Sequence, residues 1–298
     1  MQQILQMVED ASQKFMFGHV TLDEEGIAGF RLDGLDESVR FFSPPAYLAG
    51  LIAREEKETA YKVVHCFNAI QASLQYAFFS GNASVRLGGV DSQWVLRMVD
   101  EVFAQYQVRS VTDVYRTKDA IITRLVDSQI TMLRSRIETI EEVFARLNFY
   151  DYAAAYADVS ASLAMLSKLI CYRQDPFFKK GLFGVMMTGR MLPSLQKEHP
   201  VFAAQIVTLP VPADYQIPKM LRHYGLIRYS EALAAMVDGS VILPENSEME
   251  RNIRAATVQA CGKIAEVNGV SADAVDAYLF AKRKESDALH HLCVTERY

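Results

Sequence analysis

Apolar residues recur at helical spacing along most of this sequence, and that pattern constrains the fold more than any other feature. In residues 131–147, one face of the expected helix is apolar and carries Leu133, Ile137, Ile140, Phe144 and Leu147. The opposite face offers two i,i+4 ion pairs, Arg134 with Glu138 and Glu142 with Arg146. Similar spacing predicts a helix over residues 59–79, and the alanine-rich residues 149–170 predict a central buried helix.

Start and stop signals are densest in the last third of the chain. Pro218 suits a first helical turn, Gly225 ends that helix and Ser230 caps the next. We therefore expect three helical units: a helix–turn–helix over 216–237, a long helix over 245–268 and a last helix over 271–284.

One early segment shows a different pattern. Residues 26–42 alternate apolar and polar side chains around Asp33-Gly34, which is typical of a short β-hairpin. We therefore predict a mainly α fold in a single domain, residues 1–298. Residues 1–58 should form an N-terminal helix and β-hairpin region, and residues 59–298 a helical catalytic core.

Charge and composition limit the partners of the chain. Its net charge is −5, whereas proteins that grip a nucleic-acid strand usually offer a positive surface. No apolar run approaches the roughly 20 residues of a membrane span, so we expect a cytoplasmic protein with no membrane and no stable nucleic-acid partner. The four cysteines form no CxxC pair and no cluster has metal-ligand spacing, so we expect no metal and no other cofactor.

Asp214 is the strongest candidate for chemistry. It follows the apolar run IVTLPVP and stands at the start of the expected helix–turn–helix. Backbone N–H groups at a helix start can hold a carboxylate ionised while apolar neighbours exclude water. The alternative is that Asp214 is only an N-cap, since aspartate is common there.

The segment around Asp214 resembles the queuosine salvage family, which reads approximately ADYR-x-P-x-x-L-x-H-x-G-x-x-x-YS. The residues on that pattern are Asp214, Tyr215, Pro218, Leu221, His223, Gly225, Tyr229 and Ser230. Further similar segments follow the family's order: LQYAFFSG (Tyr76, Phe78, Phe79), PFFKKGLF (Lys179), EMERNIRAAT (Glu250, Ile253, Arg254), VDAYLF (Asp276, Tyr278, Leu279) and HHLCVTERY (His290, Thr295, Tyr298). The departures are Gln216 for arginine, Gln75 for asparagine, Phe79 for tryptophan, and Gly181-Leu182 for Ala-Gln.

The resemblance implies a helical fold like that of helix-hairpin-helix DNA glycosylases and hydrolysis of the base–sugar bond of queuosine 5′-phosphate, releasing queuine. Breaking that bond builds positive charge on the sugar, which a carboxylate such as Asp214 stabilises. Lys179 is its expected partner, contacting substrate oxygens or holding Asp214 ionised. The alternative for Lys179 is an exposed lysine of a Lys179-Lys180 pair.

Other positions on the family's pattern are expected to bind the substrate. Aromatic rings stack well on a flat base, which suits Tyr76, Phe78, Phe79 and Tyr215. The remaining candidates are Tyr229, Glu250, Arg254 and Asp276. Glu250 and Arg254 can instead be a surface i,i+4 pair. His223, near the end of its helix, is expected to be structural rather than part of the site.

Two other functions are also compatible with these sequence features. One is a base-excision glycosylase acting on DNA or RNA, against which the acidic charge balance argues. The other is a non-catalytic helical module that binds a deazaguanine ligand or a protein.

Overall fold

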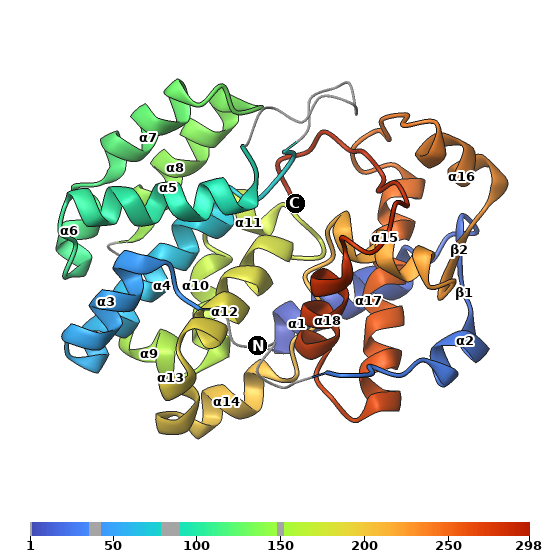
Figure 1. The fold of residues 1–298 in the computed structure, drawn as a ribbon, viewed down its shortest axis with the longest axis horizontal. Helices are drawn as coiled ribbons and strands as arrows, with labels where there is room; N and C mark the ends of the chain where they lie inside the picture. Colours follow the sequence, from blue (N-terminus) through green and yellow to red (C-terminus); the bar gives the residue numbers. More distant parts are fainter. Residues whose placement is uncertain (1, 36–42, 79–89, 148–151) are drawn as a thin grey trace.

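The structure, a computed structural model, describes residues 2–35, 43–78, 90–147 and 152–298. It is mainly helical, with one small two-stranded sheet in the described part of the chain (Figure 1). No helix among the described residues is long and apolar enough to cross a membrane.

Two main hydrophobic cores divide the described residues. The first core is buried among helices drawn blue, green and yellow in Figure 1: α3 (Ala46–Arg54), α4 (Lys57–Ser73), α5 (Ser92–Gln105), α6 (Val111–Tyr115), α7 (Lys118–Asp127), α8 (Leu133–Leu147), α9 (Tyr152–Ala157), α10 (Val159–Leu166), α11 (Ile170–Arg173), α12 (Lys179–Met191), α13 (Pro193–Glu198) and α14 (Pro200–Ile206). Helices α4 and α12 pack against each other at its centre, where Asn68 Nδ2 donates to Thr188 Oγ1 at 3.1 Å.

The second core lies under the C-terminal elements, drawn orange and red, with a short N-terminal contribution. Its elements are β1 (Val20–Leu22), α2 (Glu24–Gly29), α15 (Gln216–His223), β2 (Ile227–Tyr229), α16 (Glu231–Asp238), α17 (Glu248–Asn268) and α18 (Ala272–Lys282). Strands β1 and β2 are antiparallel, with Thr21 opposite Arg228.

The first helix, α1 (Gln2–Lys14), connects the two halves. It packs against α17 of the second core and α10 of the first. A small apolar cluster of Ala11, Phe15, Phe177 and Ala255 lies where α1, α17 and the loop before α12 meet. The two cores are therefore joined along this line.

The mainly α fold class with a small β element is confirmed, but the β element is not where the sequence placed it. The strands are 20–22 and 227–229, and residues 24–29, which include the start of the expected hairpin, form α2. The helix begins there because the Asp23 carboxylate accepts from Gly26 N at 2.9 Å. The second half of the expected hairpin, 36–42, lies outside the described residues. The likeness to helix-hairpin-helix glycosylases stays a prediction, as does the single-domain organisation.

The long C-terminal helices are confirmed, and three details further upstream are corrected. Helix α4 ends at Ser73, because the buried Arg136 of α8 donates to the carbonyls of Leu74 and Tyr76, which a longer helix would use itself. The alanine-rich segment is two helices, since Asp158 caps α10. Glu142 accepts from the backbone N–H groups of Ile170 and Cys171, so it caps α11 rather than pairing with Arg146.

Position 181 must be glycine because the ring of Phe178 packs against it. The backbone of Phe178 is left-handed, with φ +48°. A Cβ at Gly181 would lie 2.0 Å from Phe178 Cε1, and that ring is fully buried. This contact accounts for one of the departures from the family's pattern.

We predict that Gly181→Ala lowers the free energy of unfolding by about 1–3 kcal/mol, because the buried ring must move. Gly262→Ala is the matched control, since its added Cβ meets nothing within 4 Å on the exposed side of α17. That change should raise stability by about 0.4–1 kcal/mol. Denaturant unfolding measures both, and equal effects of the two changes would contradict the prediction.

Candidate functional site

The start of α12 is organised by one buried carboxylate. Asp175 Oδ2 accepts from Lys179 N at 2.8 Å and its Oδ1 from Phe177 N at 3.1 Å. A carboxylate placed there satisfies helix-start N–H groups and complements the helix dipole. It also places Lys179 and Lys180 in the first turn of α12, where both side chains are buried.

Lys179 is not the exposed lysine that the alternative interpretation required, because it is 5% exposed. Its Nζ donates to Gln75 O at 3.0 Å. Burial lowers the pKa of Lys179, and the Asp214 carboxylate opposes this more strongly than Asp175 or Asp276 does. The two predicted catalytic residues therefore lie in one electrostatic neighbourhood.

Asp214 stands at the start of α15, half-buried. Its Oδ1 accepts from Gln216 N at 2.7 Å and Ile217 N at 3.4 Å. Asp214 stands one residue before the N-cap of α15, which is Tyr215, and its Oδ1 binds the first N–H groups of that helix. The other oxygen, Oδ2, accepts no hydrogen bond within the described ranges, so it is available for a ligand or a water.

Asp276 of α18 joins the same neighbourhood. Arg190, at the far end of α12 from Lys179, donates from Nη2 to Asp276 Oδ2 and from Nε to Asp273 Oδ1, both at 2.8 Å. Burial raises the pKa of Asp276 to about 6, against the lowering effect of Arg190, and the charges of Asp273 and Asp214 raise it further. Helix α12 thus carries a cation near each of its ends, Lys179 and Arg190, and these two form a buried charge cluster with Asp214 and Asp276.

Glu250 and Arg254 are not a surface pair. Both are buried, at 2% and 1% exposure, and Arg254 Nη1 lies 3.6 Å from Glu250 Oε1. Arg254 binds both oxygens of Asp175, at 2.8 and 2.7 Å, and donates from Nε to Ala213 O at 3.1 Å. Burial raises the pKa of Glu250.

Tyr76 lies between the cluster and α8. The cationic groups of Arg136 and Lys180 each lie 4.1 Å from its ring centroid, a favourable arrangement for an aromatic face. Arg136 donates to the carbonyls of Leu74 and Tyr76, which fixes this turn. Lys180 Nζ has no hydrogen-bond partner in the part of the chain described, and burial lowers its pKa to about 8.

The other predicted aromatic residues are distributed differently. Phe78 is partly buried against the first core, with the Arg136 guanidinium 5.1 Å from its centroid. The Tyr215 ring lies 4.8 Å from that of His290. Phe79 lies outside the described residues. Tyr229 is on β2 with the Arg222 guanidinium 4.8 Å from its ring, and the charges that act on its hydroxyl are those of Arg222 and Asp238.

The sequence did not single out Asp175, Arg190, Arg136 or Lys180. Asp175 offered no capping signal, because an N-cap stands directly before its helix and Phe178 occupies that position in α12. The arginines offered no signal either, because the carbonyls and carboxylates that hold them are distant in the sequence. Within the described residues, no group of three His, Cys, Asp or Glu side chains is placed to hold a metal ion.

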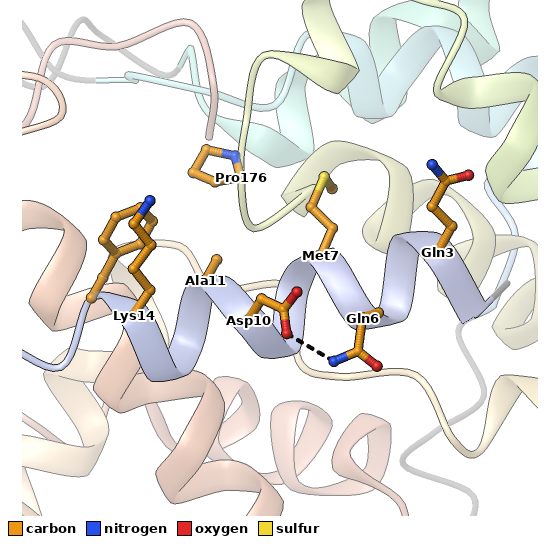
Figure 2. A pocket seen from close by; sticks show the side chains of 8 residues that line it. Gln3, Gln6, Met7, Asp10, Ala11, Lys14 and Pro176 are labelled. Atoms are coloured by element: carbon orange, nitrogen blue, oxygen red, sulfur yellow. Dashed lines mark hydrogen bonds between the residues drawn. The ribbon is translucent and has the colours of Figure 1, made fainter.

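A hollow of about 430 Å³ lies along α1, and Figure 2 shows the side chains that line it. They come from α1 together with Phe15 and Pro176. Gln6 donates to Asp10, one turn further along α1, at 2.8 Å. None of the predicted site residues lines this hollow.

Comparison with known proteins points to one family. Residues 194–296 match the family described as queuosine salvage protein, and this segment contains Asp214, Arg254 and Asp276. The chain is 42% identical over 52 residues to the queuosine 5′-phosphate N-glycosylase/hydrolase of Dictyostelium discoideum, covering 17% of this chain and 16% of that protein. It is 35% identical over 66 residues to the protein of the same name from Sphaerobacter thermophilus, covering 22% and 20%.

The resemblance to the queuosine salvage family is confirmed: the family match covers residues 194–296, and both relatives carry the name of a queuosine 5′-phosphate N-glycosylase/hydrolase. The matched segments span about a fifth or less of the length of these curated relatives. Lys179 and the aromatic residues near Tyr76 precede the segment that matches the family.

The raised pKa of Asp276 predicts a specific pH dependence of stability. A carboxyl with a pKa near 6 when folded, against 3.8 otherwise, binds its proton more tightly in the folded protein. Its contribution to stability is therefore present below about pH 4 and is lost as pH rises through 6, by up to about 3 kcal/mol.

Denaturant unfolding of the wild type and Asp276→Asn between pH 4 and pH 7.5 tests this. The free energy of unfolding of the wild type relative to the variant should fall as pH rises to about 6.5 and stay level above it. A difference that does not change with pH would show that burial does not raise this pKa.

Proposed function

We propose that this chain, through the part that matches the queuosine salvage family, is an N-glycosidase that hydrolyses queuosine 5′-phosphate and releases queuine for salvage into tRNA. The observation that carries the proposal is the Asp214 carboxylate, which has one oxygen anchored by α15 and the other free, beside the buried Lys179. The names of the two curated relatives support the substrate.

The chemistry fits a carboxylate held in this way. As the bond between base and sugar breaks, positive charge develops on the sugar, and a fixed negative charge beside it lowers the barrier without reorganising. Because Oδ1 is bound by backbone N–H groups, Oδ2 of Asp214 points with little freedom. In the proposed reaction this oxygen faces the sugar and orients or deprotonates the attacking water.

The chemistry of the base explains why catalysis must act on the sugar. A 7-deazaguanine lacks N7, so the enzyme cannot activate the leaving base by protonating that atom. Most of the rate enhancement therefore comes from Asp214, which stabilises the positive charge on the sugar, while Lys179 binds oxygens of the substrate. Phe78, Phe79 and Tyr215 are proposed to stack on the base, and Tyr76, which is fully buried beside the cations of Arg136 and Lys180, to support them from within the protein.

The other predicted binding residues take different parts in the proposal. Asp276 is the carboxyl proposed to bind the polar edge of the base or its aminomethyl group. Tyr229 is proposed to bind the substrate on the strength of its place in the family's pattern. Glu250 and Arg254 are buried, which favours a role through their neighbours rather than direct contact.

We predict that Asp214→Asn lowers kcat by about 10²–10³-fold while nucleotide binding persists, because the shape is kept and the charge is lost. Queuine release from queuosine 5′-phosphate is measured by mass spectrometry, and binding by calorimetry. Asp158→Asn is the control, since Asp158 Oδ1 caps α10 by accepting from Ser160 N, also two residues on and at 2.7 Å. Loss of activity in both variants, or in neither, would contradict the role given to Asp214.

We also predict selectivity for the mononucleotide. Hydrolysis should be faster with the 5′-phosphate than with the nucleoside, because one or two local donors suffice to hold a phosphate. Lys179→Ala should reduce this preference about tenfold or more, and Lys179→Arg, which keeps the charge, should reduce it less.

Intact tRNA that contains queuosine should release no base until it is degraded, since a chain with a net charge of −5 has little positive charge with which to bind the phosphates of a strand. Base release from intact tRNA at the rate seen with the mononucleotide would instead favour a base-excision enzyme. Activity that vanishes on chelation and returns with added metal would contradict the expected absence of a metal.

A further inference from the structure

Two buried charges connect the backbone on either side of the site. The same Asp175 oxygen, Oδ2, accepts from Lys179 N at 2.8 Å and from Arg254 Nη2 at 2.7 Å. Arg254 Nε then donates to the carbonyl of Ala213, the residue before Asp214, at 3.1 Å. A continuous chain of hydrogen bonds therefore runs from the backbone of Lys179 to the backbone next to Asp214.

This connection has little freedom to move. Arg254 holds Asp175 through two parallel hydrogen bonds, the geometry that fixes both position and orientation of a guanidinium. Its guanidinium carbon lies 4.5 Å from the Phe177 ring centroid and 4.0 Å from that of Tyr298. Both charged side chains are 1% exposed, so water does not compete for these bonds.

The connection also crosses between the two halves of the fold. Asp175 stands before α12 of the first core, and Arg254 lies in α17 beside the second. Lys179 and Asp214 are 35 residues apart in the sequence and start different helices. Arg190 of α12 also joins the halves, through Asp273 and Asp276 of α18, but it does not contact the backbone beside Asp214.

We infer that Asp175 and Arg254 are a pair of positioning residues, which set the Lys179 amine and the Asp214 carboxylate at the separation the reaction needs. Neither touches substrate, because their polar atoms are engaged within the protein and out of contact with solvent. The catalytic part of this inference, the effect on the reaction, rests on the proposed function. The mechanical part, that one ion pair holds the backbone at Lys179 and at Ala213, is independent of the proposed function.

The mechanical part is tested by hydrogen exchange of the full chain, read by mass spectrometry. Asp175→Asn and Arg254→Lys should each speed exchange at least tenfold both in residues 177–179 and in residues 213–217. The control is Asp100→Asn, because the buried Asp100 likewise accepts two backbone N–H groups at a helix start, those of Tyr47 and Leu48 at 3.0 Å. That change should leave exchange in both site segments as in the wild type.

The catalytic part is tested by kinetics on queuosine 5′-phosphate. Arg254→Lys, which keeps the charge and is the variant expected to fold best, should lower kcat at least tenfold with KM changed less than threefold, and Asp175→Asn should lower it further. Asp100→Asn should keep the wild-type kcat even if its Tm falls by a similar amount.

The outcomes separate the two hypotheses. A wild type that releases no base removes the proposed function, and the exchange experiment still decides whether the pair links both segments. Faster exchange confined to one segment, or wild-type kcat in a folded Arg254→Lys protein, overturns the positioning role. If Asp175→Asn does not fold, Arg254→Lys alone decides.

Discussion

The buried ion pair of Asp175 and Arg254 is the interaction on which the site depends. Charges taken out of water are tolerated only when their hydrogen bonds are satisfied, and breaking such a pair typically costs about 3–5 kcal/mol. Here the partners belong to the two halves of the fold, and each also holds a backbone segment of the site. Together with the pairs that Arg190 makes with Asp273 and Asp276, this ion pair therefore holds the two halves against each other.

Around this pair, the buried charges nearly compensate one another. Lys179 and Arg190 of α12 approach the carboxylates of Asp214 and Asp276, which come from the second half. Because each charge is partly balanced, the pKa of Asp276 reaches only about 6 although the side chain is buried. A site of this kind suits a reaction in which positive charge develops on the substrate, since a fixed carboxylate is already in place.

Local signals predicted the helices well where capping residues and apolar stripes agreed. Ser230 caps α16 as expected, and Ser247 and Ser271 cap the two long helices α17 and α18. Local signals failed where a distant partner decided the outcome. The expected helix beyond Ser73 is absent because Arg136 of α8 takes the carbonyls there. The strand Val20–Leu22 pairs with a segment about 200 residues later, a contact that no local pattern encodes.

The sequence by itself determined the fold class, the start of α15, the family resemblance and the hypothesis that Asp214 is catalytic, because caps, periodicity and motifs are properties of neighbouring residues. Only the tertiary structure decided that Lys179, Glu250 and Arg254 are buried, and that Asp175, Arg190 and Asp276 share the neighbourhood of Asp214. Burial and charge pairing arise between segments brought together by the packing of two cores. For that reason they set the protonation and position of the site residues, and the order of residues along the chain does not show them.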